Sequence, residues 1–149
     1  MHRRTLVALS FVLPATPVLA QAAARMPPEA PEAAPRAEAG FSAGLLTAME
    51  AGEALARERL GSRFTGVRVI RRQVPPAAWS GVEAHYLSIL TAERRWRDAG
   101  VTAPSRERMV LPPQGWTDGT QVLVLVGAHP TRAEGGLLPF SILTNLRDG

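Results

Sequence analysis

The sequence predicts an α+β fold in which two helices pack on a small, mainly antiparallel sheet of about four strands. Two segments have helical periodicity with start and stop signals, and four segments read as strands. The expected order is helix, strand, helix and then three strands. Helices and strands that do not alternate regularly along the chain are typical of this class.

The first expected element is a helix over residues 41–61. Ser42 can cap the free backbone amides at its start, and Gly61 can end it in a left-handed conformation. A stripe of small residues recurs at every fourth position: Gly44, Ala48, Gly52 and Ala56. The stripe predicts a close approach, either to the domain's own sheet or to a partner helix or ligand.

Residues 63–74 are rich in β-branched side chains and predict a strand that ends at Pro75 and Pro76. Three arginines are expected on a solvated side of this strand: Arg68, Arg71 and Arg72. The second helix is expected over residues 81–98, because Ser80 and Glu83 match a capping box and Gly100 follows its end.

Two titratable residues of the second helix stand out. Glu93 falls within the apolar arc, close to Tyr86, and His85 falls at the edge of that arc. A carboxylate in this position must be paired or must lie at an opening, because an unpaired buried charge is costly. One interpretation is an ion pair with Arg97 at the rim of the core. The other is a polar group that lines a pocket between helix and sheet.

Three strands are expected to close the chain, over residues 106–111, 120–127 and 136–146. The middle one is apolar on both faces, which indicates a central strand covered on each side. The last one alternates apolar and polar residues. Because Pro139 lacks a backbone N–H, this last strand is expected at an edge of the sheet or with a bulge.

The loop between the last two strands has the sequence AHPTRAEGG, residues 128–136. His129, Arg132 and Glu134 together could bind an anion or move a proton. The proline and the paired glycines also explain the segment as ordinary turn chemistry, with His129 as a solvated entry residue.

The start of the chain predicts export. Residues 1–20 have a basic beginning, an apolar stretch and small residues before Ala20, which is typical of a signal peptide cut after that residue. This pattern favours the Sec route, while Arg3 and Arg4 also fit a twin-arginine signal. Residues 21–40 are rich in alanine and proline and predict a disordered linker, which leaves residues 41–149 as one globular domain. We therefore expect a periplasmic or secreted protein with no membrane span in the mature chain.

Composition narrows the chemistry. The chain has no lysine and no cysteine, which excludes Schiff-base lysines, disulfides and thiolate catalysis. Loss of Arg3 and Arg4 lowers the basic count from 17 to 15 against 13 acidic residues, a net charge of +2 that does not indicate nucleic-acid binding. His85 and His129 form no metal-ligand motif, and no phosphate or dinucleotide fingerprint is present, so neither a metal nor a cofactor is indicated.

Besides a structural envelope protein in which the linker is only a spacer, two functions remain open. The first is a non-enzymatic binding or accessory module for an unknown envelope protein or small ligand. Its contact candidates are loop-edge aromatic residues, a helix tyrosine and a loop arginine: Trp79, Trp116, Tyr86 and Arg132. The alternative is a small cofactor-independent enzyme that uses acid–base chemistry in a helix–sheet cleft. Its candidates are two histidines and two carboxylates: His85, His129, Glu93 and Glu134. That enzyme requires a histidine and a carboxylate within hydrogen-bonding reach of each other.

Overall fold

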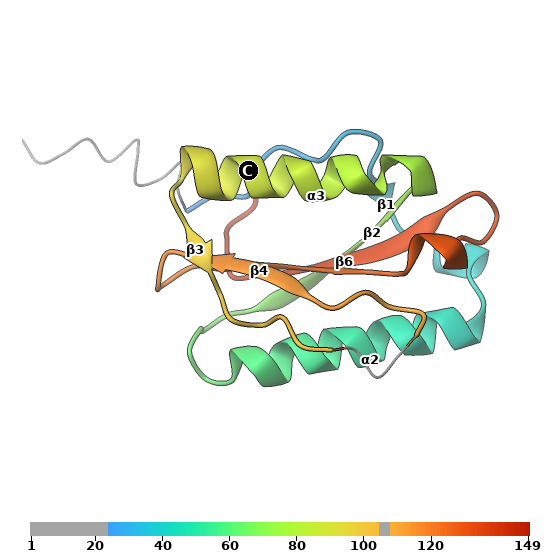
Figure 1. The fold of residues 1–149 in the computed structure, drawn as a ribbon, viewed down its shortest axis with the longest axis horizontal. Coiled ribbons are helices and arrows are strands. Elements are labelled where there is room, and N and C mark those ends of the chain that lie inside the picture. Colours follow the sequence, from blue (N-terminus) through green and yellow to red (C-terminus); the bar gives the residue numbers. More distant parts are fainter. Residues whose placement is uncertain (1–23, 105–107) are drawn as a thin grey trace, which may run out of the picture.

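The computed structural model describes residues 24–104 and 108–149, so the expected signal peptide lies outside the described residues. The fold is α+β, as predicted, with a helix on each face of an antiparallel sheet (Figure 1). The sheet has six strands in the order β1-β2-β6-β5-β4-β3, rather than about four. The strands are β1 (Ala34–Pro35), β2 (Arg68–Val74), β3 (Arg97–Asp98), β4 (Gln114–Thr117), β5 (Val122–Gly127) and β6 (Leu138–Thr144).

The first long helix, α2 (Ala43–Leu60), agrees with the prediction at both ends. The Ser42 hydroxyl accepts a hydrogen bond from the Leu45 amide at 3.3 Å, and Gly61 follows the last turn with a φ of 58°. The small-residue stripe packs on the sheet at Gly52, where an added Cβ would lie 2.8 Å from a methyl group of Val126. This part of the stripe is therefore used within the domain.

The second long helix, α3 (Trp79–Leu87), begins before the predicted start. A 3-10 turn, η2 (Pro76–Ala78), leads directly into it, and no side chain caps its first turn. The predicted capping box is therefore wrong. Ser80 lies inside the first turn, and the Glu83 carboxylate accepts a hydrogen bond from the Gln114 side chain instead.

The end of the second helix also differs from the prediction. The chain passes from α3 into a π-helical segment, η3 (Ser88–Glu93), in which the Arg94 amide donates to the Ile89 carbonyl at 2.9 Å. Arg95 then takes a left-handed φ of 58°, which stops the helix before Arg97 enters β3. Glu93 is exposed, and the expected helical pair between Glu93 and Arg97 does not form, because these residues lie in different elements.

The centre of the sheet is formed by β5 and β6. Every residue of β5 is buried, as expected of a strand covered on both faces. The prediction that the last strand lies at an edge or carries a bulge is wrong, because β6 pairs in continuous register with β2 on one side and with β5 on the other. Pro139 lies next to the first residue of β6, and its carbonyl still accepts from the Ala128 amide at 3.1 Å. The ladder therefore lacks only the hydrogen bond that a backbone N–H at this position could donate.

The strand predicted over residues 106–111 is also corrected. The first of the three closing strands is β4 instead, while residues 105–107 lie outside the described residues. Val110 makes only an isolated bridge to Ala128, beside the far end of β5. Pro112 and Pro113 separate this bridge from β4, because prolines cannot donate to a ladder.

Residues 24–40 are the described part of the disordered linker predicted over residues 21–40, and they pack along the domain. The Met26 amide donates to the Arg147 carbonyl at 2.7 Å, Ala30 is buried, and β1 adds an edge strand to β2. The low apolar content of this segment is offset by hydrogen bonds to the folded domain, above all from Arg36. The described part of the linker is therefore a component of the fold.

Candidate functional site

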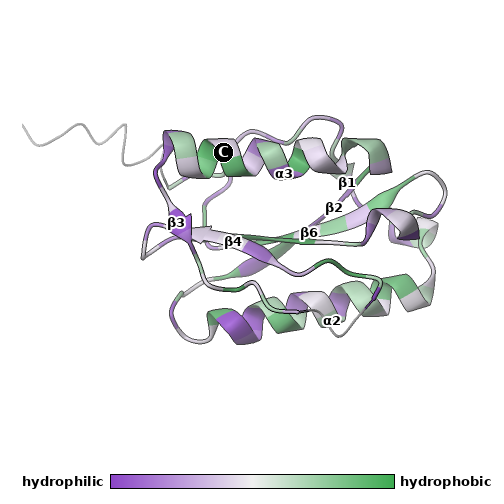
Figure 2. Cartoon of the chain, viewed as in Figure 1, coloured by the Kyte–Doolittle hydropathy of each residue, from purple (hydrophilic) through white to green (hydrophobic). Residues whose placement is uncertain are grey.

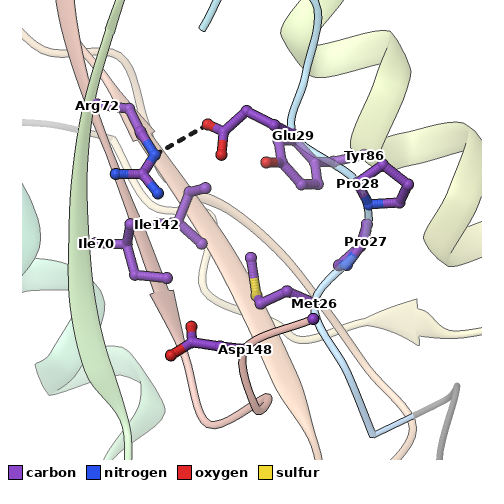
Figure 3. A pocket seen from close by; sticks show the side chains of 10 residues that line it. Met26, Pro27, Pro28, Glu29, Ile70, Arg72, Tyr86, Ile142 and Asp148 are labelled. Carbon is purple, nitrogen blue, oxygen red and sulfur yellow. Dashed lines mark hydrogen bonds and ion pairs between the residues drawn. The ribbon is translucent and has the colours of Figure 1, made fainter. Parts of the chain in front are cut away.

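A cleft of about 430 Å³ opens on the face of the sheet that α3 covers (Figure 3). This volume lies in the range of small-molecule sites. The walls come from the N-terminal segment, from α3, from strands β2 and β6 and from the C-terminal residues. The lining residues are Met26, Pro27, Pro28, Glu29, Ile70, Arg72, Tyr86, Ile142, Asp148 and Gly149.

The floor of the cleft is apolar. Ile70 of β2 and Ile142 of β6 are direct partners in the antiparallel ladder, so their side chains lie together on one face of the sheet. Ile142 is buried and Ile70 is half-buried. The Met26 side chain extends from the N-terminal segment toward them (Figure 3). These three side chains give a hydrocarbon surface that a ligand could cover.

One end of the cleft carries an ion pair. The Arg72 Nε donates to the Glu29 carboxylate at 2.9 Å, with 26% and 47% of the two side chains exposed. Arg72 faces the cleft because residues two apart on a strand share a face, and Ile70 precedes it by two positions. The expectation of three arginines on one solvated side is therefore replaced by a different arrangement, with Arg71 on the α2 face and Arg72 in the cleft.

Tyr86 brings a hydroxyl group from α3 to the same end, close to Glu29 in the view of Figure 3. Burial and the nearby Glu29 carboxylate raise the pKa of Tyr86 to about 12, against the smaller opposing effects of Arg72 and a backbone hydrogen bond with Ala30. The phenol therefore stays protonated at neutral pH and can donate a hydrogen bond.

The opposite end of the cleft is acidic at its surface. Asp148, with 88% of its side chain exposed, pairs with Arg68 at 2.8 Å, and the same guanidinium donates to the Leu146 carbonyl at 2.9 Å. Arg68 and Arg72 lie on the same face of β2, on either side of Ile70. Arg72 is thus paired with a carboxylate from the N-terminal segment, Glu29, and Arg68 with a carboxylate near the C-terminus, Asp148.

The N-terminal wall is held by hydrogen bonds to its backbone. The His85 Nε2 of α3 donates to the Pro28 carbonyl at 2.7 Å, and Arg94 donates to the Arg25 carbonyl at 2.8 Å. Met26 is tied to Arg147, as described above. These contacts fix residues 25–28 beside α3, and they give His85 a structural role as a donor.

The four acid–base candidates do not come together as pairs. His129 caps the 3-10 turn η4 (Pro130–Arg132), where its Nδ1 accepts from the Thr131 amide at 3.2 Å. Within the described ranges, neither this ring nor that of His85 has a carboxylate partner. Glu93 is exposed on η3.

Glu134 has a different partner. Its carboxylate accepts from the Ser42 amide at 2.6 Å and from the Ser42 hydroxyl at 2.8 Å, at the start of α2. The backbone bond and then the hydroxyl bond from Ser42 lower the pKa of Glu134. Glu134 therefore ties the loop between β5 and β6 to the helix start, a position that favours negative charge.

The contact candidates are divided between core and surface. Trp79 and Trp116 are 4% and 6% exposed, and Trp79 packs against Phe140 with ring centroids 5.5 Å apart. Arg132 is exposed on η4. Tyr86 is the one of these four candidates that lines the cleft.

A second polar cluster lies on the other face of the sheet, and the sequence alone does not predict it. Glu53 of α2 is 5% exposed and accepts from Arg71 at 3.0 Å and from Ser141 at 2.7 Å. Burial raises the pKa of Glu53, but the bonds from Arg71 and Ser141 outweigh it, so the pKa lies below its ordinary value. Figure 2 shows hydrophilic stretches along β2, the strand that carries Arg71. This cluster joins α2 to the sheet.

Arg36 extends the same cluster from the N-terminal segment. Its guanidinium donates to the Ser141 hydroxyl at 3.0 Å, to the Arg72 carbonyl at 3.2 Å and to the Phe140 carbonyl. Burial lowers the pKa of Arg36 to about 10, and the nearby Glu53 opposes this effect. Arg36 remains charged at neutral pH and fastens the segment to two central strands.

Other kinds of site find little support in the described part of the chain. No group of three or more histidine or acidic side chains there could hold a metal ion. In the same residues, no helix has the length and apolar character needed to cross a membrane. Comparison of the chain with protein families, with curated proteins and with solved structures gave no match. The cleft is therefore the strongest candidate site on geometry alone.

Proposed function

We propose that the protein is an exported, non-enzymatic binding or accessory module that holds a small ligand in the cleft beside α3. The observation that carries this proposal is the cleft itself, with an apolar floor of Ile70 and Ile142 and an Arg72–Glu29 pair at one end. A largely apolar surface with a few placed polar groups is the usual character of a small-molecule site.

Export is supported by the amino-acid pattern of residues 1–20, a basic start followed by an apolar stretch and small residues before Ala20. The protein would act in the periplasm or outside the cell, where the ligand would be met. The acid–base enzyme has weaker support, because His85 and His129 each bond to other groups and have no carboxylate partner among the described residues.

The proposal is tested by paired denaturing and native mass spectrometry of the protein purified from the exported fraction. We expect the denaturing mass to correspond to cleavage after Ala20. The native mass should be larger by the mass of a small molecule. An uncleaved chain would contradict export, and equal masses would contradict ligand binding.

Two matched variants assign the extra mass to the cleft. Ile70→Trp fills the floor, whereas Val69→Trp changes a half-buried neighbour that faces the other side of the same strand. Both variants are first checked for cooperative thermal unfolding. The extra mass should disappear in Ile70→Trp and persist in Val69→Trp. Retention of the ligand by a folded Ile70→Trp variant would place binding elsewhere.

A further inference from the structure

The two ends of the cleft differ in the groups that they offer to a ligand. At one end, Arg72 is a hydrogen-bond donor that also holds the Glu29 carboxylate, while the Tyr86 side chain beside them is only 1% exposed. At the other end, Asp148 presents an exposed carboxylate whose partner, Arg68, already donates to it and to the Leu146 carbonyl. A ligand with a negatively charged group would therefore place that group at the Arg72 end.

Arg72 keeps donors that the fold does not use. A guanidinium has five N–H donors. The Nε donor of Arg72 is taken by Glu29, and Nη1 makes a long contact of 3.5 Å with the Arg71 carbonyl. No described residue accepts a hydrogen bond from Nη2. Figure 3 shows the terminal nitrogens on the side of the cleft floor. These donors form a planar edge that suits a carboxylate.

The floor beside this edge suits a hydrocarbon chain. Ile70, Ile142 and Met26 offer only apolar atoms, and the pair formed by Arg72 and Glu29 stands next to them. Covering such a surface removes apolar area from water. A flexible methionine side chain also adapts to ligands of different shape. The cleft therefore has separate places for a charged group and for an apolar chain.

We propose that the ligand of the cleft is an amphipathic carboxylate, with its carboxylate on the free edge of Arg72 and its hydrocarbon part over Ile70, Ile142 and Met26. This inference rests on the proposed function, because it names the class of ligand for that same cleft. Glu29 already accepts a hydrogen bond from Arg72 and competes with the ligand carboxylate for it. Glu29 therefore lowers the affinity of the cleft for this ligand.

Nuclear magnetic resonance of methionine methyl groups tests the proposal on the exported protein. Met26 lies in the cleft, and Met49 is fully buried in α2 on the other face of the sheet and serves as an internal control. The probes are octanoate, octanol, octylammonium and acetate. We expect octanoate to move the Met26 signal and to bind at least about tenfold more tightly than octanol or octylammonium. Acetate, which lacks the chain, should leave the signal unchanged.

Three variants assign the head group. Arg72→Gln should weaken octanoate binding by about tenfold and leave octanol binding unchanged, because one charged donor edge is lost. Arg68→Gln, on the same face of the same strand, should have little effect, since Arg68 is bonded to Leu146 and Asp148. Glu29→Gln should tighten octanoate binding, an increase that a merely destabilising substitution would not produce.

The outcomes separate this inference from the proposed function. Equal binding of octanoate, octanol and octylammonium, or an unchanged octanoate affinity in folded Arg72→Gln, overturns the carboxylate inference but leaves cleft binding intact. A Met26 signal that moves neither with these probes nor with small molecules extracted from the envelope contradicts both proposals.

Discussion

Arg36 provides the sharpest test of the fold, because it belongs to a segment that composition alone assigns to a linker. In Arg36→Met, the aliphatic stem is kept and the guanidinium is lost. Three hydrogen bonds from a charged donor are removed, to the Arg72 carbonyl, the Phe140 carbonyl and the Ser141 hydroxyl. Such bonds contribute about 1.5–3 kcal/mol each. Since Arg36 is only half-buried, we discount the sum by about half and expect a loss of about 2–4 kcal/mol.

The assay is thermal unfolding at neutral pH, followed by far-ultraviolet circular dichroism. A loss of this size lowers the melting temperature by about 8–16 °C, at about 4 °C per kcal/mol for a domain of this size. The control is Arg132→Met, which changes an exposed arginine of η4 and should stay within about 0.5 kcal/mol of the unaltered protein. If Arg36→Met also stayed within this range, residues 24–40 would not be part of the cooperative unit.

Further predictions concern packing and pH. Gly127→Ala should destabilise the protein by about 1–3 kcal/mol, because the new Cβ would lie 2.4 Å from ring atoms of buried Trp79. Gly44→Ala should stabilise the protein by about 0.5–1 kcal/mol, because the new Cβ in α2 would have no atom within 4 Å. Thermal unfolding measures both variants, and a Gly44→Ala variant less stable than Gly127→Ala would contradict these predictions. Ser42 lowers the pKa of Glu134, so the stability advantage over Glu134→Gln should be complete well above pH 4.5 and shrink as the pH falls below it. An advantage that grew on acidification would contradict the assigned partner.

The parts of the fold that the sequence predicts best are those with local signals. The start and end of α2 depend on Ser42 and Gly61, which act within one turn of the helix. The apolar run of β5 predicts its central place because both faces must be covered. These signals need no knowledge of distant residues.

The errors arise where distant contacts decide the structure. The π-helical segment η3 and the left-handed Arg95 end the second helix early. Trp96, which follows directly, is buried in the core with 5% of its surface exposed. Arg36 bonds to Phe140, which lies 104 positions away, so composition within residues 21–40 gives no sign of its anchoring. Helical periodicity and local composition do not report such contacts.

The candidate site was predicted only in part. The sequence indicates Tyr86 and a helix–sheet cleft, but His85 contacts the cleft wall, His129 and Glu134 make capping contacts, and Glu93 is exposed. Arg68, Ile70 and Arg72 lie two positions apart along β2, so the sequence already indicates a single strand face that carries both polar and apolar side chains. What could not be predicted is the wall, because residues 26–29 reach this face only through tertiary contacts.

The most direct test of the central claim is a spectrum of the methionine methyl groups of the purified protein, recorded with and without small molecules extracted from the envelope fraction. Binding in the cleft predicts that the Met26 signal moves while the Met49 signal, on the opposite face of the sheet, stays in place. The shift should be absent in Ile70→Trp. An unmoved Met26 signal, or equal shifts of both methionines, would contradict the assignment of this cleft as the binding site.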